Sequence, residues 1–434
     1  MKRFLSILLA AALSLMAVPA SALADEVSET AGSDNPTVGS GEEARSLDEL
    51  LQAGDYVPGR VLAHVNDDFA PVSAYSSNGG GWSASNLYTF DPQPEAGAEA
   101  DAPLARSMPT PEQVILIESG TQSTEDLLRD LADTPGVLAA QPDYVRYIDD
   151  LETQAKPVEE PAAALSADTA PTDDPLIGLQ WHLAPTDEIA GAANVETLWG
   201  DEGIPGRPWQ GKEEVVVAVV DTGVDCTNPD LKDVMWENPG NIGLEGEHGY
   251  DYGMGDDDPM DNDGHGTHVA GIIAASVNNG EGVAGVAPNA KIMALRVANE
   301  SGGFLTSAVL GAYSYMKKAA QARVNLVAAN NSWMGAGESP LLTEVMDDLY
   351  RSNGVLSVCA SGNYAADLDQ SLNLPAGAPT DGAIAVNAVD REGRLASFSD
   401  YGAAATDLAA PGTDILSTAP QGQGIVDGDD PELT

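Results

Sequence analysis

Residues 215–220 read VVVAVV and are followed by Asp221, Thr222 and Gly223. A continuous run of β-branched and small apolar residues is typical of a strand buried on both faces of a parallel sheet. Further along, segments of strand length alternate with segments of helical length: strands are expected at 290–297, 324–328 and 355–359, and helices at 265–276, 306–321 and 341–351. This alternation predicts an α/β domain over residues 175–434, with a doubly wound, mostly parallel sheet.

A smaller α+β unit is expected ahead of this domain, over residues 56–148. Its strands are predicted at 56–65, 113–118 and 137–148 and its helix at 123–133, which suits a ferredoxin-like domain. Serine, glycine, alanine and proline dominate residues 67–111, which we interpret as a surface insertion. The acidic, Pro/Ala-rich residues 149–174 are predicted to be a linker that proteases can reach.

The N-terminus predicts export. Lys2 and Arg3 precede an apolar run over 4–18, and Ala-Leu-Ala at 22–24 is a small-x-small cleavage pattern. The run is short for a membrane span, and no later segment is long and apolar enough to cross a bilayer. Residues 1–24 therefore predict a Sec-type signal peptide and a secreted or cell-surface protein. The polar residues 25–55 are expected to form a flexible leader.

Charge and cysteine content exclude several classes of function. The 434 residues include 68 acidic and 19 basic side chains, for a net charge of −49. Phosphate backbones and anionic membrane surfaces would repel such a chain, so it is not expected to bind nucleic acid. Two cysteines are too few for a disulfide scaffold. Cys226 and Cys359 could pair in an oxidising compartment, but a buried free thiol is favoured for Cys359 because it ends an apolar strand.

Two motifs carry candidate chemistry. Asp221 stands at the carboxyl end of the predicted central strand, where α/β proteins place their reactive groups. Residues 263–271 read DGHGTHVAG and place His265 at the start of a helix, between two glycines that allow another backbone to approach. A carboxylate and a histidine on separate elements can be the orienting group and the base of a nucleophilic triad.

These motifs resemble the subtilisin-like serine peptidases, the subtilases, whose triad runs in the order Asp, His, Ser. The resemblance extends over further segments at 217–225, 282–288, 331–333, 360–363 and 409–412. It implies that Asp221 orients His265, that His265 is the base and that Asn363 supplies the oxyanion hole. It also implies that peptide or protein substrates bind at four residues: Ser332, Trp333, Met334 and Gly362.

The expected nucleophile does not follow. The family carries a Gly-Thr-Ser-Met-like motif beyond the segment resembling 409–412, whereas residues 412–414 here read GTD. We therefore expect a truncated, inactive chain whose serine lies beyond Thr434. If Thr434 is the true C-terminus, the alternative is a non-catalytic, peptide-binding pseudo-protease. A metallohydrolase that uses His265 and His268 is a further alternative, although no H-E-x-x-H signature is present.

The resemblance also implies an inhibitor and a cofactor. The unit at 56–148 would be a propeptide that inhibits its own catalytic domain, with its last strand in the substrate groove and the maturation cut within 149–174. Calcium is the implied structural ion, with Asp230 and Asn279 as ligands. The nearby acidic cluster of Asp256, Asp257, Asp258, Asp261 and Asp263 is interpreted as a solvated loop.

Overall fold

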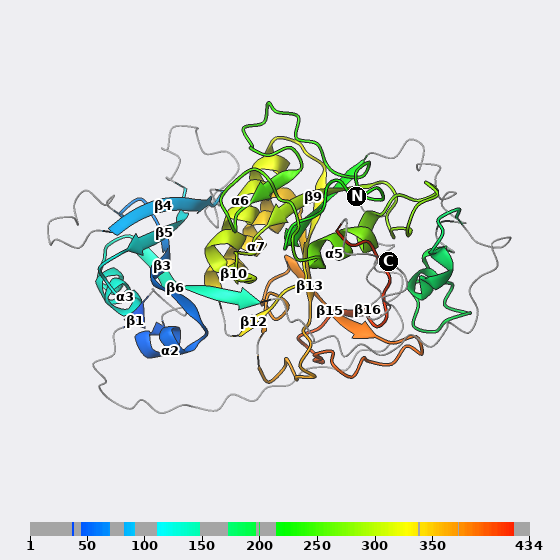
Figure 1. Cartoon of the computed structure of the whole chain (residues 1–434). Helices are drawn as coiled ribbons and strands as arrows, with labels where there is room; N and C mark the ends of the chain where they lie inside the picture. The colour runs from blue at the N-terminus through cyan, green and yellow to red at the C-terminus, as the bar shows by residue number, and fades with distance from the viewer. Residues whose placement is uncertain are drawn as a thin grey trace, which may run out of the picture.

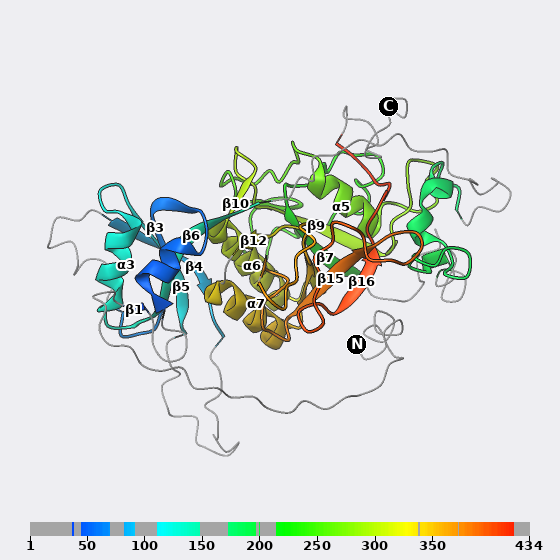
Figure 2. The ribbon, with the colours of Figure 1, turned by 90° about the horizontal axis from the view of Figure 1, so that it is seen from below.

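The computed structural model describes residues 37–38, 45–69, 82–91, 111–147, 172–196, 199, 214–336, 339–371 and 373–420. They form an N-terminal antiparallel sheet and a larger α/β domain, which lie side by side in Figures 1 and 2. The predicted signal peptide at 1–24 and most of the predicted linker lie outside the described residues. No helix in the described ranges is long and apolar enough to cross a membrane.

A parallel sheet of seven strands, in the order β16-β15-β13-β11-β7-β9-β8, forms the centre of the α/β domain. Its strands are β7 (Val215–Asp221), β8 (Gly249–Asp251), β9 (Ala290–Arg296), β11 (Leu326–Asn331), β13 (Leu356–Ala360), β15 (Ala383–Val389) and β16 (Leu408–Pro411). Its helices are α5 (His265–Ala274), α6 (Thr306–Gln321) and α7 (Pro340–Asn353). The predicted α/β class and the parallel sheet are confirmed.

The central strand β7 is buried on both faces, as its sequence predicts. Val216, Ala218 and Val220 belong to the core that includes α6 and α7. Val219 belongs to a second core, which contains the apolar residues of α5. Helices therefore cover both faces of the sheet, which is the doubly wound arrangement. Cys226 and Cys359 contribute to different cores and are both free thiols, so the predicted free thiol at Cys359 is confirmed.

The N-terminal sheet has the strand order β6-β3-β5-β4, with every neighbouring pair antiparallel. Its elements are β3 (Tyr56–Val65), β4 (Trp82–Thr89), β5 (Gln113–Ser119), α3 (Thr124–Ala132) and β6 (Val137–Tyr147). Ser123 caps α3 in a capping box with Asp126, as the sequence indicates. Counted along the unit, the strand order is 4-1-3-2, that of a ferredoxin-like sheet.

The structure corrects three of the predicted boundaries. The predicted flexible leader at 25–55 contains β1 (Thr37–Val38), β2 (Arg45–Ser46) and α2 (Leu47–Gln52), and apolar residues of α2 join the N-terminal core. The predicted insertion at 67–111 contains β4, whose Tyr88 is buried. The strand predicted at 324–328 is shifted to β11, because the Val324 N–H donates to Ala319 O and closes α6 instead.

One strand of the α/β domain extends the N-terminal sheet. Strand β10 (Gly303–Leu305) pairs antiparallel with the end of β6, with Arg146 opposite Phe304. Figure 1 shows β6 reaching from the N-terminal unit to β10 and β12 (Gly335–Ala336). A small sheet of β12 and β14 (Asn373–Leu374) completes the described strands. Backbone pairing therefore joins the two units.

A buried polar cluster adds to this contact. The Tyr88 hydroxyl donates to Asp348 Oδ2 over 2.8 Å, and Lys317 Nζ donates to the same oxygen over 2.7 Å. Lys317 Nζ also donates to Thr89 O over 2.7 Å. Tyr88 and Thr89 belong to β4, whereas Lys317 and Asp348 belong to α6 and α7. The edge strand that the sequence did not predict is thus fixed to the α/β domain by charge-assisted hydrogen bonds.

Replacing Tyr88 with phenylalanine tests the weight of this cluster. Tyr88→Phe keeps the ring and removes only the hydroxyl, so the free energy of unfolding is expected to fall by about 1.5 kcal/mol. Denaturant titration measures the change. The matched control is Tyr401→Phe, because Tyr401 is exposed and its hydroxyl makes no hydrogen bond with the described residues. Equal losses in the two variants would contradict the prediction.

Candidate active site

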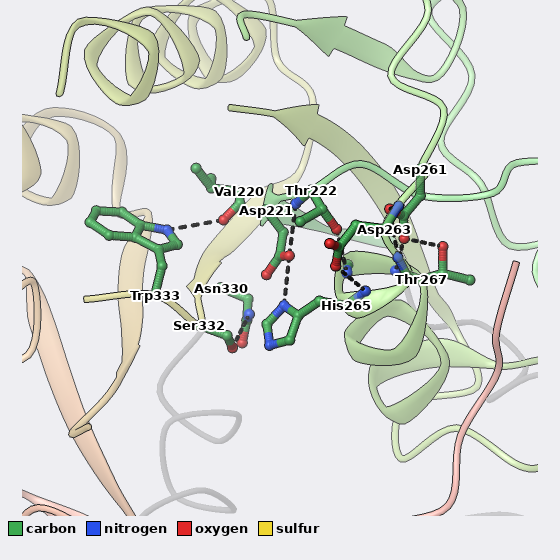
Figure 3. Close-up of polar contacts among 12 residues, drawn as sticks. Val220, Asp221, Thr222, Asp261, Asp263, His265, Thr267, Asn330, Ser332 and Trp333 are labelled. Atoms are coloured by element: carbon green, nitrogen blue, oxygen red, sulfur yellow. Dashed lines mark hydrogen bonds and ion pairs between the residues drawn. The ribbon is translucent and has the colours of Figure 1, made fainter. Parts of the chain in front are cut away.

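Three candidate residues lie at one edge of the sheet. Strands β7, β11 and β13 are parallel neighbours, so their carboxyl ends meet at the same edge. Asp221 ends β7, Ser332 follows β11 and Gly362 follows β13. In the view of Figure 3, Asp221 and Ser332 flank the ring of His265. The sheet therefore gathers residues that are more than 100 positions apart in the sequence.

His265 reaches this edge from the first turn of α5. A side chain at Gly266 would collide with Gly223 O and lie 3.2 Å from Asp221 Cβ, so only glycine allows α5 to approach β7 here. The Gly266 N–H donates to Thr222 Oγ1 over 2.9 Å. The predicted close backbone approach is confirmed, and it places the imidazole against the carboxylate.

Asp261 holds the start of α5. Its Oδ1 accepts the N–H groups of Asp263 and Gly264, both over 3.0 Å. Its Oδ2 accepts the N–H and the hydroxyl of Thr267 over 2.9 and 2.6 Å. The interpretation of the acidic cluster as a solvated loop is wrong for Asp261, which is buried, whereas the other four members are exposed. A sequence signal existed: an Asp shortly before a helix start is a common cap.

The central contact of the site is a hydrogen bond between His265 Nδ1 and Asp221 Oδ1, 2.7 Å long. The Thr222 N–H donates to the same oxygen, also over 2.7 Å. Asp221 is fully buried, whereas 31% of the His265 side chain is exposed. Figure 3 shows the second ring nitrogen, Nε2, pointing away from Asp221. The carboxylate thus fixes the ring and leaves Nε2 open to a reactant.

The site is electrostatically set to hold a proton on His265. Burial alone lowers the pKa of His265, but the charge and hydrogen bond of Asp221, together with the charges of Asp263 and Asp261, raise it to about 9. The neutral ring, which can accept a proton, therefore predominates only at alkaline pH. Because this pKa exceeds the ordinary value, the ion pair stabilises the fold fully below about pH 6.5 and ceases to do so as pH rises through about 9.

Two of the predicted substrate-binding residues lie elsewhere than the sequence suggested. The side chain of Trp333 is in the core: it is 2% exposed, its Nε1–H donates to Val220 O over 3.0 Å and its ring meets Phe304 edge-on. The prediction that Trp333 lines the groove is wrong, because indole burial and its hydrogen bond outweigh exposure. Ser332 Oγ accepts a hydrogen bond from Asn330 Nδ2 over 2.9 Å.

Met334 and Gly362 lie together beside a buried carboxylate. A side chain at Gly362 would meet Met334 Cε at 2.8 Å and collide with Asp400 Oδ2. Asp400 Oδ1 accepts the N–H groups of Tyr364 and Ala366 over 2.8 and 2.9 Å. Asp400 therefore shapes the loop that carries Asn363.

Asn363 itself is half-buried, and within the described residues no hydrogen bond holds its side-chain amide. The amide is thus available to a ligand at the end of β13.

The structure does not place His265 and His268 in a common metal site. His268 Nε2 lies 3.0 Å from Ile415 O, and its ring faces this carbonyl rather than the Asp221 carboxylate. The Ser417 hydroxyl donates to His268 O over 2.7 Å and is thereby occupied. No group of three or more His, Cys, Asp or Glu side chains in the described part of the chain is arranged to hold a metal ion. The metallohydrolase alternative has no geometric support here.

The two predicted calcium ligands are in contact. Asn279 Nδ2 donates to Asp230 Oδ1 over 2.8 Å, and the Val283 N–H donates to Oδ2 over 2.9 Å. Asp230 is 3% exposed, and no basic side chain in the described ranges pairs with it. Burial raises the pKa of Asp230 to about 6, and the charges of Asp174 and Glu281 act in the same direction. A buried carboxylate beside amide and carbonyl oxygens has the donor chemistry that calcium requires.

Comparison with known proteins places this geometry in a family. Residues 212–430, half of the chain, match the sequence profile of the subtilase family, Peptidase_S8. The thermophilic serine proteinase of Bacillus sp. (strain AK1) is 38% identical over 202 residues, which cover 46% of this chain and 45% of that protein. Subtilisin DY of Bacillus licheniformis is 36% identical over 207 residues, covering 48% of this chain and 67% of the relative.

Two further similarities were found. The major intracellular serine protease of Bacillus subtilis (strain 168) is 35% identical over 225 residues, which cover 51% of this chain and 63% of that protein. A solved structure of a protease from Pseudoalteromonas arctica has a TM-score of 0.46 and 29% identity, over 58% of this chain and 79% of the other. The chain thus spans less than two thirds of the first two relatives it matches.

The pKa of His265 can be measured directly by following its ring protons in NMR spectra as a function of pH. We expect a value near 9 in the native chain. Asp221→Asn removes the opposing charge, so burial should then lower the pKa of His265 below about 6.5. Asp67→Asn, an exposed site in the N-terminal unit, is the matched control and should change nothing. An unperturbed native value, or one insensitive to Asp221→Asn, would contradict the assignment of the pair.

Proposed function

Because this chain belongs to the subtilase family of serine peptidases, we propose that it is the precursor of a secreted endopeptidase that hydrolyses peptide bonds by an Asp-His-Ser triad. The observation that carries the proposal is the 2.7 Å hydrogen bond between His265 Nδ1 and the fully buried Asp221. This contact leaves Nε2 open at the carboxyl edge of a parallel sheet. Export follows from the predicted signal peptide at 1–24.

The chemistry assigns one role to each group. His265 Nε2 accepts the proton of a serine hydroxyl as the serine oxygen attacks the peptide carbonyl carbon. Asp221 keeps the proton of the other ring nitrogen in place and stabilises the imidazolium. The Asn363 amide donates a hydrogen bond to the oxyanion of the tetrahedral intermediate. The imidazolium then gives its proton to the departing amine, and water repeats the sequence on the acyl-enzyme.

The serine is the missing member of this set. Within residues 214–336, 339–371 and 373–420, no hydroxyl is hydrogen-bonded to His265 Nε2, and the Ser417 hydroxyl is bonded to His268 O. We propose that the nucleophile lies beyond Thr434. Reading the coding DNA in frame past Thr434 tests this. A Gly-Thr-Ser-Met-like motif within a few dozen codons supports the peptidase, whereas an immediate stop codon would favour the peptide-binding alternative.

In the chain extended to include that serine, His265→Ala should lower kcat by at least about 10⁴-fold, because the remaining groups cannot activate the nucleophile. Ser417→Ala is the matched control. It removes a hydroxyl that lies near α5 but is not part of the triad, so kcat should stay within about twofold. Hydrolysis of a chromogenic peptide measures both. A large loss in Ser417→Ala with normal folding would assign the nucleophile to Ser417 and overturn the proposal.

The contact between the units supports a role for residues 56–148 as an intramolecular inhibitor. The end of β6 pairs with β10 and donates a hydrogen bond from Arg146 Nη1 to Gly335 O of β12 over 3.1 Å. We propose that peptide substrates lie in this same position as an added strand, a common mode of peptide recognition. Cleavage within 149–174 would then release the inhibitor.

Calcium is proposed as a structural ion held by Asp230 and Asn279, where it would offset the buried negative charge. The carboxyl group must lose its proton to bind, so calcium stabilisation should be small at pH 5 and complete above about pH 7, given the pKa of about 6. At a calcium concentration 100 times its dissociation constant, the gain in unfolding free energy is about 2.7 kcal/mol.

Thermal unfolding with calcium or with a chelator measures this gain. Asp230→Asn should abolish it, whereas Asp233→Asn, an exposed neighbour, should retain it. Stabilisation of the Asp230→Asn variant equal to that of the native chain would contradict the site.

A further inference from the structure

One histidine lies between carboxylates that belong to the two different units. His64, on β3, has Nε2 2.9 Å from Glu112 Oε2 and Nδ1 3.0 Å from Glu344 Oε2. Glu112 precedes β5 in the N-terminal unit, whereas Glu344 lies in α7 of the α/β domain. The His64 side chain is only 10% exposed, and its ring packs on Phe90 with the ring centroids 4.7 Å apart.

Both ring nitrogens face a carboxylate, and this settles the charge of the ring. A neutral imidazole has one N–H and can donate to one partner only, whereas an imidazolium can donate to both. In the neutral form, a lone pair would face a carboxylate and two negative groups would flank an uncharged ring. The charged groups facing His64 are these two glutamates, one from each unit. The docked arrangement therefore requires a protonated His64.

We propose that His64 is a pH-dependent latch, which holds the N-terminal unit on the α/β domain when protonated and loosens it as pH rises. The inference rests on the proposed function, in which the N-terminal unit covers the substrate groove. It adds the condition that controls release: loss of one proton from a ring whose partners belong to both sides of the contact.

The direction of the effect follows from proton linkage. Burial lowers the pKa of His64, but the hydrogen bonds and charges of Glu344 and Glu112 more than offset this and raise it. Once the units separate, Glu344 is gone and the ring is solvated, so its pKa returns toward about 6.5. Docking therefore binds a proton. The docked state is favoured fully below about pH 6.5 and loses this advantage as pH rises, by at most about tenfold in the docking equilibrium per pH unit.

The other polar contacts across this surface have ordinary charge states in that range. Arg60 pairs with Asp143 over 3.2 Å, and Asp143 accepts the Ser307 hydroxyl over 2.8 Å. Lys317 pairs with Asp348. These arginine, lysine and aspartate groups keep the unit docked but do not change charge between about pH 6.5 and 9. His64 is thus the contact through which pH in this range acts on docking.

Amide hydrogen exchange of the full chain, read by mass spectrometry over residues 145–147 and 303–305, measures docking at the strand pair β6–β10. His64→Gln keeps a polar side chain that cannot be charged. Native chain and variant are compared at the same pH, so that the intrinsic pH dependence of exchange cancels. At pH 6 we expect exchange to be at least tenfold slower in the native chain, and the difference should shrink steadily toward pH 9.

Two further variants sharpen the test. Glu344→Gln removes the partner on the α/β domain and should also weaken protection at pH 6, which guards against a folding defect specific to position 64. His248→Gln is the matched control, because His248 bonds to Trp236 O within the α/β domain and is outside the contact. It should exchange like the native chain at every pH.

The outcomes separate the latch from the proposed function. Equal exchange in the native chain and His64→Gln at pH 6, or a difference that does not change with pH, would overturn the latch while leaving docking intact. Free exchange of both segments at every pH in every variant would show that the N-terminal unit does not cover the groove, so that the inhibitor role and the latch fail together. The peptidase assignment is tested separately, through the coding sequence and His265.

Discussion

The site depends on one constraint: the carboxylate of Asp221 has no access to water. It ends a strand whose side chains serve two cores, so it is fully buried at the sheet edge. A buried charge is tolerated only when it is paired. Its partner, His265, can come within 2.7 Å only because Gly266 lets α5 approach β7 and because Asp261 caps that helix. The orientation of the base thus follows from how the central strand is buried.

The residues that sequence reasoning located are those with strong local signals. The apolar run of β7, the glycines around His265 and the capping box of α3 each act within a few positions. The elements that it missed depend on distant contacts. Strand β4 reads WSASNLYT and is held by Tyr88 against α7. The burial of Trp333 depends on Val220 and Phe304, which are 113 and 29 positions away. No local pattern encodes such partners.

The contact between the units shows how a chain of net charge −49 brings two of its parts together. Like charges on both surfaces oppose docking. The few basic residues are concentrated where this matters: Arg60 pairs with Asp143, Lys317 with Asp348, and Arg146 reaches the carbonyl of Gly335. His64 adds one more positive charge to this surface, but only when protonated. The balance at the contact is therefore sensitive to a single proton in a way that the core of either unit is not.

His265 and His64 share one environment, a ring held by carboxylates, and differ in where those carboxylates belong. For His265, the hydrogen-bonded carboxylate is part of the same domain, so loss of the proton changes the chemistry of the ring without moving any element. For His64, one carboxylate belongs to each unit, so the same loss removes a link between them. Rising pH thus acts on both rings in one direction. It frees the base of the active site and weakens the contact that covers the groove.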